Sequence, residues 1–224
     1  MLMSAGRVSE VFFSIQGEGP TAGVPAVFIR LQGCSVGCSW CDTKYAWPEG
    51  GGREVDLDAL VSEAAAHSCR RVVITGGEPL ESSLFLPLAT ALSRKDFDVE
   101  IETSGTIEPP PELNTPDLAW NVSVKLASSG VSEARRINAA AIRALLRRDA
   151  WWKFVVADED DVAEVLRLAE RFALPRPRIL LQPEGTRREE LIERSGWVVE
   201  ACKRHGFRFS PRLHVLIWGA RRGV

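Results

Sequence analysis

Three of the five cysteines of this chain lie in one short segment, GCSVGCSWCDT at residues 33–43. The thiols of Cys34, Cys38 and Cys41 follow directly after an apolar run, and the glycines beside them leave the backbone free to bend around a bound group. Thiolates bind zinc, and they also hold iron–sulfur clusters. The residue types and their spacing therefore predict a metal centre in this loop.

The sequence leaves two kinds of metal centre open. Structural zinc needs four ligands that usually come as two pairs, and no second pair accompanies the three cysteines. The remaining candidate ligands are scattered along the chain: His67, Cys69, Cys202, His205 and His214. An iron–sulfur cluster is normally held by four thiolates, so three would leave one iron open to another molecule. The missing pair favours the cluster, and zinc remains the alternative.

A second segment that could bind a ligand is RVVITGGEPL at residues 71–80. It places Gly76, Gly77, Glu78 and Pro79 at the end of a predicted strand. Taken alone, these residues are typical of a tight turn in which proline begins a helix. Glycines also allow the backbone to approach a ligand closely, and the neighbouring cysteines favour this second interpretation.

The stretch before the cysteines offers a third set of polar residues. It contains Gln-Gly-Glu-Gly at residues 16–19 in a predicted loop, and Arg30 lies on the strand that follows. A dinucleotide-binding fingerprint would need a preceding strand, a following helix and a third glycine in register, and Pro20 and Gly23 interrupt that pattern. The loop is therefore a structural turn or a binding loop of another kind.

Strands must position these loops, and their pattern predicts a parallel sheet. Apolar runs typical of strands are AVFIRLQ at 26–32, RVVIT at 71–75, DVEIET at 98–103, AWNVSVK at 119–125, WWKFVVA at 151–157, RILLQP at 178–183 and FRFSPRL at 207–213. Helices are predicted near residues 57–66, after an N-cap at Asp158, and from Thr186, where Glu189 completes a capping box. In such an alternation the loops at the C-terminal ends of the strands meet at one edge and carry the site.

Composition indicates one ordinary globular domain over residues 1–224. Hydrophobic residues make up 45% and charged residues 26% of the chain, so it can bury one sizeable core. The net charge of −2 provides no general positive field for nucleic acid. The N-terminal residues do not resemble an export signal, and no run approaches the roughly 20 apolar residues of a membrane span. We therefore expect a cytoplasmic protein whose odd number of cysteines argues against a disulfide framework.

These segments together resemble a known group of enzymes. The cysteine run with its Trp-Cys-Asp-Thr end resembles the signature of the radical S-adenosylmethionine (SAM) superfamily, and Gly-Gly-Glu-Pro resembles the second motif of that superfamily. Nearly the whole chain resembles the 7-carboxy-7-deazaguanine synthase family, including IETSGT at 101–106, SVKLASSG at 123–130, LQPEG at 181–185 and the final SPRLHVLIWGARRGV. One departure is Val124, where the family usually has proline, and it puts the local backbone shape in doubt.

The resemblance implies a fold and a reaction. The fold would be α/β, an incomplete parallel β/α barrel of the radical SAM type. The enzyme would be a carbon–nitrogen lyase that converts 6-carboxy-5,6,7,8-tetrahydropterin to 7-carboxy-7-deazaguanine, with loss of ammonia, in queuosine and deazapurine biosynthesis. Cys34, Cys38 and Cys41 would hold a 4Fe-4S cluster that binds SAM and generates a 5′-deoxyadenosyl radical. A flavodoxin- or ferredoxin-like donor would supply the electron, and the family expectation is a homodimer.

The resemblance also implies which residues surround SAM. They come from the cysteine loop, the glycine motif and the later strand ends: Trp40, Asp42, Gly76, Gly77, Glu78, Ser123, Lys125 and Gln182. Glu78 and the neighbouring backbone would hold the amine of SAM, and Gln182 would contact the adenine. Thr43 would bind Mg²⁺ through its hydroxyl, and an ordinary capping threonine is the alternative.

A further set of residues would bind the substrate: Ile15, Gln16, Gly17, Glu18, Arg30, Thr75 and Val224. Arg30 would grip the substrate carboxylate with its planar guanidinium, while Gln16, Thr75 and nearby backbone would read the pterin edges. Glu18 would either accept a hydrogen bond from the aminopyrimidinone edge or orient Gln16. The C-terminal carboxylate of Val224 would reach the base.

Two other functions remain as alternatives. A glycyl-radical-enzyme activase has a similar cysteine spacing and acts on a protein, but it gives no reason for the 16–19 loop and Arg30. A non-catalytic zinc-binding module would need only the metal ligands. Cys69 and Cys202 are expected to be free thiols, and His214 is either a site residue or a structural histidine.

Overall fold

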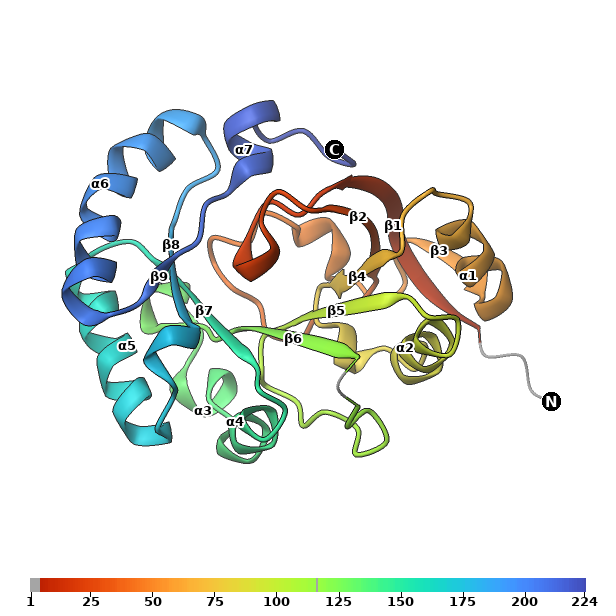
Figure 1. Cartoon of the computed structure of the whole chain (residues 1–224), viewed down its shortest axis with the longest axis horizontal. Coiled ribbons are helices and arrows are strands. Elements are labelled where there is room, and N and C mark those ends of the chain that lie inside the picture. Colours follow the sequence, from red (N-terminus) through yellow and green to blue (C-terminus); the bar gives the residue numbers. More distant parts are fainter. Residues whose placement is uncertain (1–4, 116) are drawn as a thin grey trace.

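The computed structural model describes residues 5–115 and 117–224, and a curved sheet of nine strands forms its centre (Figure 1). The strands are β1 (Ala5–Ile15), β2 (Pro25–Leu31), β3 (Arg53–Asp56), β4 (Arg71–Gly76), β5 (Asp98–Thr103), β6 (Leu118–Ser123), β7 (Trp151–Val156), β8 (Ile179–Pro183) and β9 (Arg208–Phe209). Their order across the sheet is β3-β1-β2-β4-β5-β6-β7-β8-β9. Neighbours from β2 to β9 are parallel, and β1 is antiparallel to β2 and β3. The sheet ends at β3 and β9 without closing, as an incomplete barrel requires.

The connecting helices lie around the outside of the curved sheet (Figure 1). They are α1 (Leu57–Ala65), α2 (Phe85–Ser93), α3 (Glu133–Arg136), α4 (Ala139–Leu146), α5 (Glu159–Phe172) and α6 (Arg188–His205), while α7 (Leu213–Trp218) follows the last strand and lies at the top of this view. The core lies between these helices and the sheet, where Trp120, Trp152 and Phe154 are almost completely buried. Parallel strands that are covered on both faces read as nearly continuous apolar runs, which is why the sequence revealed them.

The seven strands predicted from the sequence are confirmed as β2 and β4 to β9. The last is much shorter than its apolar run, because Ser210–Arg212 leave the sheet and α7 follows. Strands β1 and β3 were not predicted. β3 is only four residues long and mostly polar, and β1 contains a register shift that breaks the apolar alternation of an ordinary antiparallel strand.

The helix predicted near residues 57–66 is confirmed as α1, and of the two other predicted helix starts one is confirmed and one is shifted. Asp158 caps α5, and its carboxylate accepts a hydrogen bond of 3.0 Å from the backbone N–H of Asp161. At α6 the capping box is displaced by one residue, because Arg187 is the N-cap and Glu190, not Glu189, accepts from the N–H groups before the helix. Within the described residues, no helix combines the length and apolar character needed to cross a bilayer.

The two cysteines outside residues 33–43 lie away from that segment. Cys202 is buried on α6 against the core, and burial raises the pKa of its thiol to about 11. Cys69 precedes β4, at the opposite end of that strand from the glycine motif, and lies 3.3 Å from the carbonyl oxygen of Pro25. Both are free thiols, as expected.

Gly196 within α6 and Gly206 directly after it give a matched test of this helix. Gly196 lies exposed in its middle, and a Cβ there would meet no atom within 4 Å. We expect Gly196→Ala to raise the free energy of unfolding by about 1 kcal/mol, because alanine loses less conformational entropy in a helix. Thermal denaturation should then show a rise in Tm of about 3 °C.

Gly206, at the end of the same helix, serves as the control. It also has free space around its Cβ position, but its φ of +71° is strained for any side chain. Gly206→Ala should therefore lower the Tm. A fall in Tm for Gly196→Ala would contradict the regular helical course of α6 through this position.

Candidate active site

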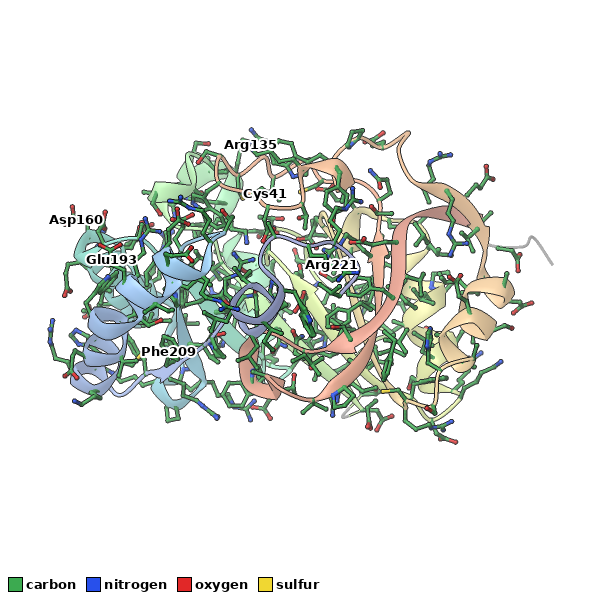
Figure 2. The ribbon with its side chains drawn as sticks, turned by 90° about the horizontal axis from the view of Figure 1, so that it is seen from above. Cys41, Arg135, Asp160, Glu193, Phe209 and Arg221 are labelled. Carbon is green, nitrogen blue, oxygen red and sulfur yellow. The ribbon has the colours of Figure 1, made fainter. Side chains whose placement is uncertain are left out.

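A cavity of about 530 Å³ opens at the C-terminal ends of the parallel strands. The loop after β2, the loop after β1 and the C-terminal segment complete its wall. Cys41 and Arg221 belong to two of these parts, and in Figure 2 Arg221 lies near the middle of the molecule with Cys41 above it. This edge of the sheet is where the sequence predicted the site.

The cavity brings together nearly all the residues predicted for the site. Those that line it are Ile15, Gln16, Gly17, Glu18, Arg30, Cys34, Cys38, Trp40, Cys41, Asp42, Thr43, Thr75, Gly76, Gly77, Ser123, Lys125, Gln182 and Val224. His214 also lines the cavity, so its position is that of a site residue. Glu78 is the exception, because its side chain points elsewhere.

The cysteine loop is held in place by backbone hydrogen bonds. The N–H of Gly33 donates to the carbonyl of Ala46 at 2.8 Å, and the N–H of Ser39 donates to the carbonyl of Ser129 at 2.9 Å. Cys38 is buried and the other two thiols are half-buried, and all three pack around Val36 and Val131. The loop therefore presents its three sulfurs toward one region of the cavity.

The donor set fits a cluster better than a single zinc ion. Across the described residues, no three side chains of His, Cys, Asp and Glu lie close enough together to hold one metal ion. An iron–sulfur cluster is larger than an ion, and its thiolates stand further apart around it. Neither Cys69 nor Cys202 can complete a zinc site without leaving its own place in the fold.

The glycine motif supports the cysteine loop by packing directly against its backbone. A Cβ on Gly77 would lie 2.3 Å from the carbonyl oxygen of Gly33 and 2.4 Å from Cβ of Cys34. The next residue adds a hydrogen bond of 2.9 Å from the N–H of Glu78 to that same carbonyl. Glycine is thus needed here for contact with protein backbone, in addition to any contact with a ligand.

The carboxylate of Glu78 is buried and used within the protein. It accepts hydrogen bonds from the Thr103 hydroxyl at 2.7 Å, from the N–H and hydroxyl of Ser104, and from the N–H of Leu80 at 3.2 Å. Burial raises its pKa, although these hydrogen bonds oppose the shift. This corrects the expectation that the Glu78 acid holds the amine of SAM, since the side chain instead ties the turn after β4 to the end of β5.

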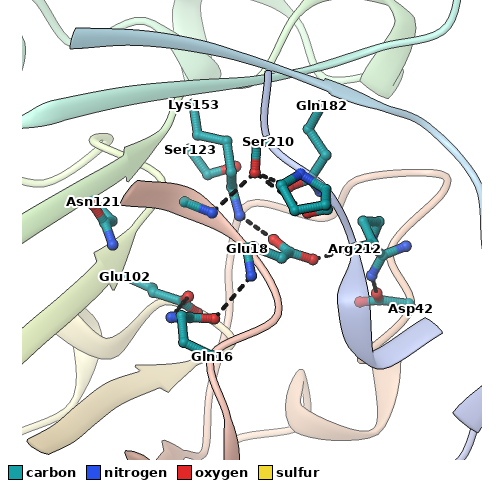
Figure 3. Close-up of polar contacts among 12 residues, drawn as sticks. Gln16, Glu18, Asp42, Glu102, Asn121, Ser123, Lys153, Gln182, Ser210 and Arg212 are labelled. Atoms are coloured by element: carbon teal, nitrogen blue, oxygen red, sulfur yellow. Dashed lines mark hydrogen bonds and ion pairs between the residues drawn. The ribbon is translucent and has the colours of Figure 1, made fainter. Parts of the chain in front are cut away.

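The loop after β1 is fixed by a buried ionic cluster (Figure 3). Glu18 accepts from Nζ of Lys153 and, at 2.9 Å, from Nε of Arg212. Arg212 also donates to Asp42 in the cysteine loop and to the carbonyl of Gly185 after β8. Burial alone would raise the pKa of Glu18, but Lys153 and Arg212 outweigh it and hold the pKa well below its ordinary value. The Glu18 carboxylate therefore joins the loop after β1 to β7 and to the segment before α7, and Arg212 extends the cluster to the cysteine loop and the loop after β8.

Sequence reasoning missed Lys153 and Arg212. A lysine within the apolar run WWKFVVA was the available signal for the first, because a buried lysine needs a partner. Nearness to Glu18 raises the pKa of Lys153 against the opposing effect of burial, so the ammonium keeps its charge.

The side chain of Gln16 is likewise used within the protein. Its amide nitrogen donates to Glu100 at 2.8 Å and to Glu102 at 3.0 Å, and its oxygen accepts from the N–H of Glu18 at 3.2 Å. Gln16 also lines the cavity, and a contact between its amide and the substrate stays a prediction. Glu18 orients Gln16 through its backbone N–H, while the Glu18 carboxylate pairs with Lys153 and Arg212.

The wall near the cysteine loop carries a lysine beside an indole ring. Nζ of Lys125 lies 5.5 Å from the centre of the Trp40 ring and donates to Oγ of Ser123 at 2.9 Å. Val124 between them is buried in the core. Ser123 and Lys125, on either side of it, both line the cavity.

Other predicted residues have specific surroundings. The hydroxyl of Thr43 lies 3.4 Å from Sγ of Cys41 and makes no capping hydrogen bond to the short helix that follows. Gln182 accepts from Oγ of Ser210 at 3.2 Å. The side chain of Thr43 therefore does not cap this helix, and its hydroxyl oxygen lies beside Cys41.

The C-terminal segment closes over the loop after β1. The N–H of Leu213 donates to the carbonyl of Gly17 at 2.9 Å, and a Cβ on Gly17 would lie 2.1 Å from Nδ1 of His214. Gly17 is therefore required by the imidazole packed against it. Burial lowers the pKa of His214 in spite of the nearby Glu18, which favours the neutral imidazole near pH 7.

The ionic cluster makes a prediction about stability. We expect Lys153→Met to lower the free energy of unfolding by about 3 kcal/mol near neutral pH, because the buried Glu18 keeps one cation in place of two. A lowered folded-state pKa gives stability that is present above the ordinary glutamate value and is lost as the pH falls through the lowered value. Urea titrations should therefore show a smaller difference between the two proteins at about pH 3.5 than at about pH 7, with the decrease confined to pH values below the ordinary glutamate pKa.

Arg53→Met is the matched control, because Arg53 forms an exposed pair with Glu63. It should change the free energy of unfolding by less than about 1 kcal/mol at either pH. A Lys153→Met effect that does not depend on pH would show that the pairing with Glu18 is not its cause.

Comparison with known proteins places this architecture. The family model described as Radical SAM superfamily matches residues 28–114, which include the cysteine loop and the glycine motif. The crystal structure of QueE from Escherichia coli superposes with a TM-score of 0.76 at 31% identity, covering 94% of this chain and 95% of that one. The structure of Streptococcus suis SuiB shares the fold alone, with a TM-score of 0.59 at 11% identity.

Curated relatives extend over almost the whole chain. The 7-carboxy-7-deazaguanine synthase of Pyrobaculum aerophilum is 43% identical over 97% of this chain and 96% of its own length. The enzymes of that name from Hyperthermus butylicus and Escherichia coli are 36% and 33% identical, over 94% and 92% of this chain. Sequence similarity over this length, together with the shared fold and motifs, shows that the chain belongs to the 7-carboxy-7-deazaguanine synthase family of radical SAM enzymes.

Proposed function

We propose that this chain is a lyase that converts 6-carboxy-5,6,7,8-tetrahydropterin to 7-carboxy-7-deazaguanine with loss of ammonia, using a 4Fe-4S cluster and SAM. Family membership supports the reaction. The observation that carries the proposal is one cavity of about 530 Å³, lined by the three thiols and also by Arg30 and Thr75. This volume is within the range of small-molecule sites and favours a small substrate over the protein partner of an activase.

The bound cluster and SAM would supply a radical that removes hydrogen from the substrate. The residues of the chain have other tasks: they bind, orient and exclude water. Arg30 would hold the substrate carboxylate, and Thr75 at the end of β4 would hydrogen-bond to the ring. The glycines of the second motif and the Ser123–Lys125 pair would meet SAM, with Gln182 beside its adenine.

The ionic cluster around Glu18 would form the wall beside the pterin. Its carboxylate is already paired with Lys153 and Arg212, so it would accept a hydrogen bond from the ring without gaining a proton. His214 packs on Gly17 beside it. We propose that this fixed wall sets the position of the ring relative to the cysteine loop.

The finer features of the assignment are part of the same proposal. Thr43 would bind Mg²⁺ through an oxygen that no helix cap occupies. Val224 lines the cavity and would bring its terminal carboxylate to the base. We also expect one domain over residues 1–224, a cytoplasmic homodimer and a flavodoxin- or ferredoxin-like electron donor.

The reaction is tested with anaerobically reconstituted enzyme, reductant, SAM, Mg²⁺ and carboxytetrahydropterin. We expect mass spectrometry to detect 7-carboxy-7-deazaguanine without a matching loss of SAM, since the family chemistry regenerates it. Omitting Mg²⁺ should lower the rate if Thr43 holds the ion. Cleavage of SAM with the pterin left intact would refute the substrate, and binding of zinc without a cluster would refute the whole assignment.

Arg30 gives a prediction about substrate binding. We expect Arg30→Gln to raise KM for the pterin by about 100-fold, because a charge-assisted pair to a carboxylate is lost in a site with little water. Arg30→Lys should recover only part of the loss, since an ammonium cannot make the planar contact. Steady-state kinetics with the pterin and with SAM varied separately would check this, and an equal rise in both KM values would argue against a contact with the substrate carboxylate.

A further inference from the structure

A bulge in β1 brings an unpredicted carboxylate beside Arg30. Val8 lies opposite Leu31 and Glu10 lies opposite Arg30, so Ser9 is an extra residue in β1. If regular pairing continued from Val8, Ser9 would lie opposite Arg30 and Glu10 opposite Ile29, which faces the core. Residues opposite each other in an antiparallel pair point to the same face, so the bulge turns Glu10 into the cavity with Arg30.

Three groups converge on the Glu10 carboxylate. Nε of Arg30 donates to it at 2.8 Å, and the hydroxyl of Tyr45 donates to the same oxygen at 2.7 Å. Nη2 of Arg222 lies 4.0 Å from its second oxygen. The guanidinium carbon of Arg222 also lies 3.4 Å from the centre of the Tyr45 ring. Glu10 is therefore shared between the strand that carries Arg30 and the C-terminal tail, residues 219–224.

The contact with Glu10 sets the direction of the Arg30 guanidinium. Its Nε faces Glu10, and its Nη1 donates to the carbonyl of Gly76 at 3.4 Å. A second carboxylate would then be met end-on by Nη1 and Nη2. Nearby acidic groups raise the pKa of Arg30 against the effect of burial, so its charge is permanent and can be divided between two carboxylates.

The tail forms part of the cavity wall. Gly219, Arg222 and Val224 all line the cavity, and the guanidinium of Arg222 packs on the ring of Tyr45. An arginine stacked on an aromatic ring is held by the ring face and, here, by the charge of Glu10 as well. Release of Arg222 would loosen the segment that covers the cavity.

We propose that Glu10 is a positioning residue that couples Arg30 to closure of the C-terminal tail, with Tyr45 and Arg222 as the latch. The coupling to substrate rests on the proposed function. When a substrate carboxylate takes a share of the Arg30 charge, Glu10 is left less neutralised and pairs more strongly with Arg222. Tail closure thereby favours a carboxylated ligand, and by linkage an open tail weakens its binding.

Trypsin provides a readout that does not depend on turnover, because it cleaves after Arg221 and Arg222 in the tail. We expect trypsin to remove the last residues of the reconstituted Glu10→Gln enzyme on the order of tenfold faster than those of wild type, because a charged partner of the latch becomes neutral. Intact-mass spectrometry measures the rate of this cleavage. Glu54→Gln, the same substitution on exposed β3, should leave the rate unchanged. Equal rates for Glu10→Gln and wild type would overturn the latch.

A pair of Tyr45 variants keeps the test decisive if Glu10→Gln folds poorly. Tyr45→Phe keeps the ring under Arg222 and loses the hydroxyl that bonds to Glu10, whereas Tyr45→Ala loses both. We expect cleavage to increase in the order wild type, Tyr45→Phe, Tyr45→Ala. Slower or equal cleavage of Tyr45→Ala would contradict a latch made by stacking.

The coupling is tested with SAM and two pterins in the absence of reductant, so that no turnover occurs. We expect 6-carboxytetrahydropterin to slow tail cleavage on the order of tenfold in wild type and not in Glu10→Gln, and tetrahydropterin without the carboxylate to have no effect. Equal protection by both pterins would refute coupling through Arg30. Absence of calorimetric binding of the carboxylated pterin would refute the proposed function and the coupling with it, while the ligand-free cleavage rates still decide the latch.

Discussion

The buried carboxylate of Glu18 is the constraint on which the cavity depends. A carboxylate that loses its water must be paired, and here Lys153 from β7 and Arg212 from the segment before α7 supply the charge. Arg212 extends the cluster to Asp42 and to the loop after β8. The loop after β1, the cysteine loop, the strand ends and the C-terminal segment are therefore held in one arrangement by charge as much as by apolar packing.

Most of the sheet could be predicted because its strands are covered on both faces. Burial on both sides leaves a mainly apolar run in the sequence, as in WWKFVVA and RILLQP, where Lys153 and Gln182 are the polar residues that face the cavity. β1 gave no such signal, since the bulge at Ser9 places Val8 and Val11 on the same face although they are three residues apart. Its period is neither that of a strand nor that of a helix, and pairing with β2 is what determines its course.

The members of the site could be predicted better than their contacts. Motifs located the cysteine loop, the glycine turn and Arg30, and these line one cavity. The hydrogen bonds that Glu78 and Gln16 make within the protein could not be predicted. Their partners are distant in sequence and are brought near by the fold: Thr103 and Ser104 for Glu78, and Glu100 and Glu102 for Gln16. Glu10 and Lys153 were missed for the same reason: a buried charge is recognised by its partner, and the partner is distant in sequence.

The pairing of Glu18 with Arg212 also determines when the cavity can form during synthesis. The two residues are 194 positions apart, and Leu213 reaches back to Gly17 over a similar separation. Contacts between such distant parts of a chain raise the contact order and form late, after the loop-closure entropy has been overcome. A nascent chain can build much of the sheet while it is still being translated, but the wall around Glu18 waits for the last residues. The cavity wall can therefore form only after Arg212 and Leu213 have been synthesised.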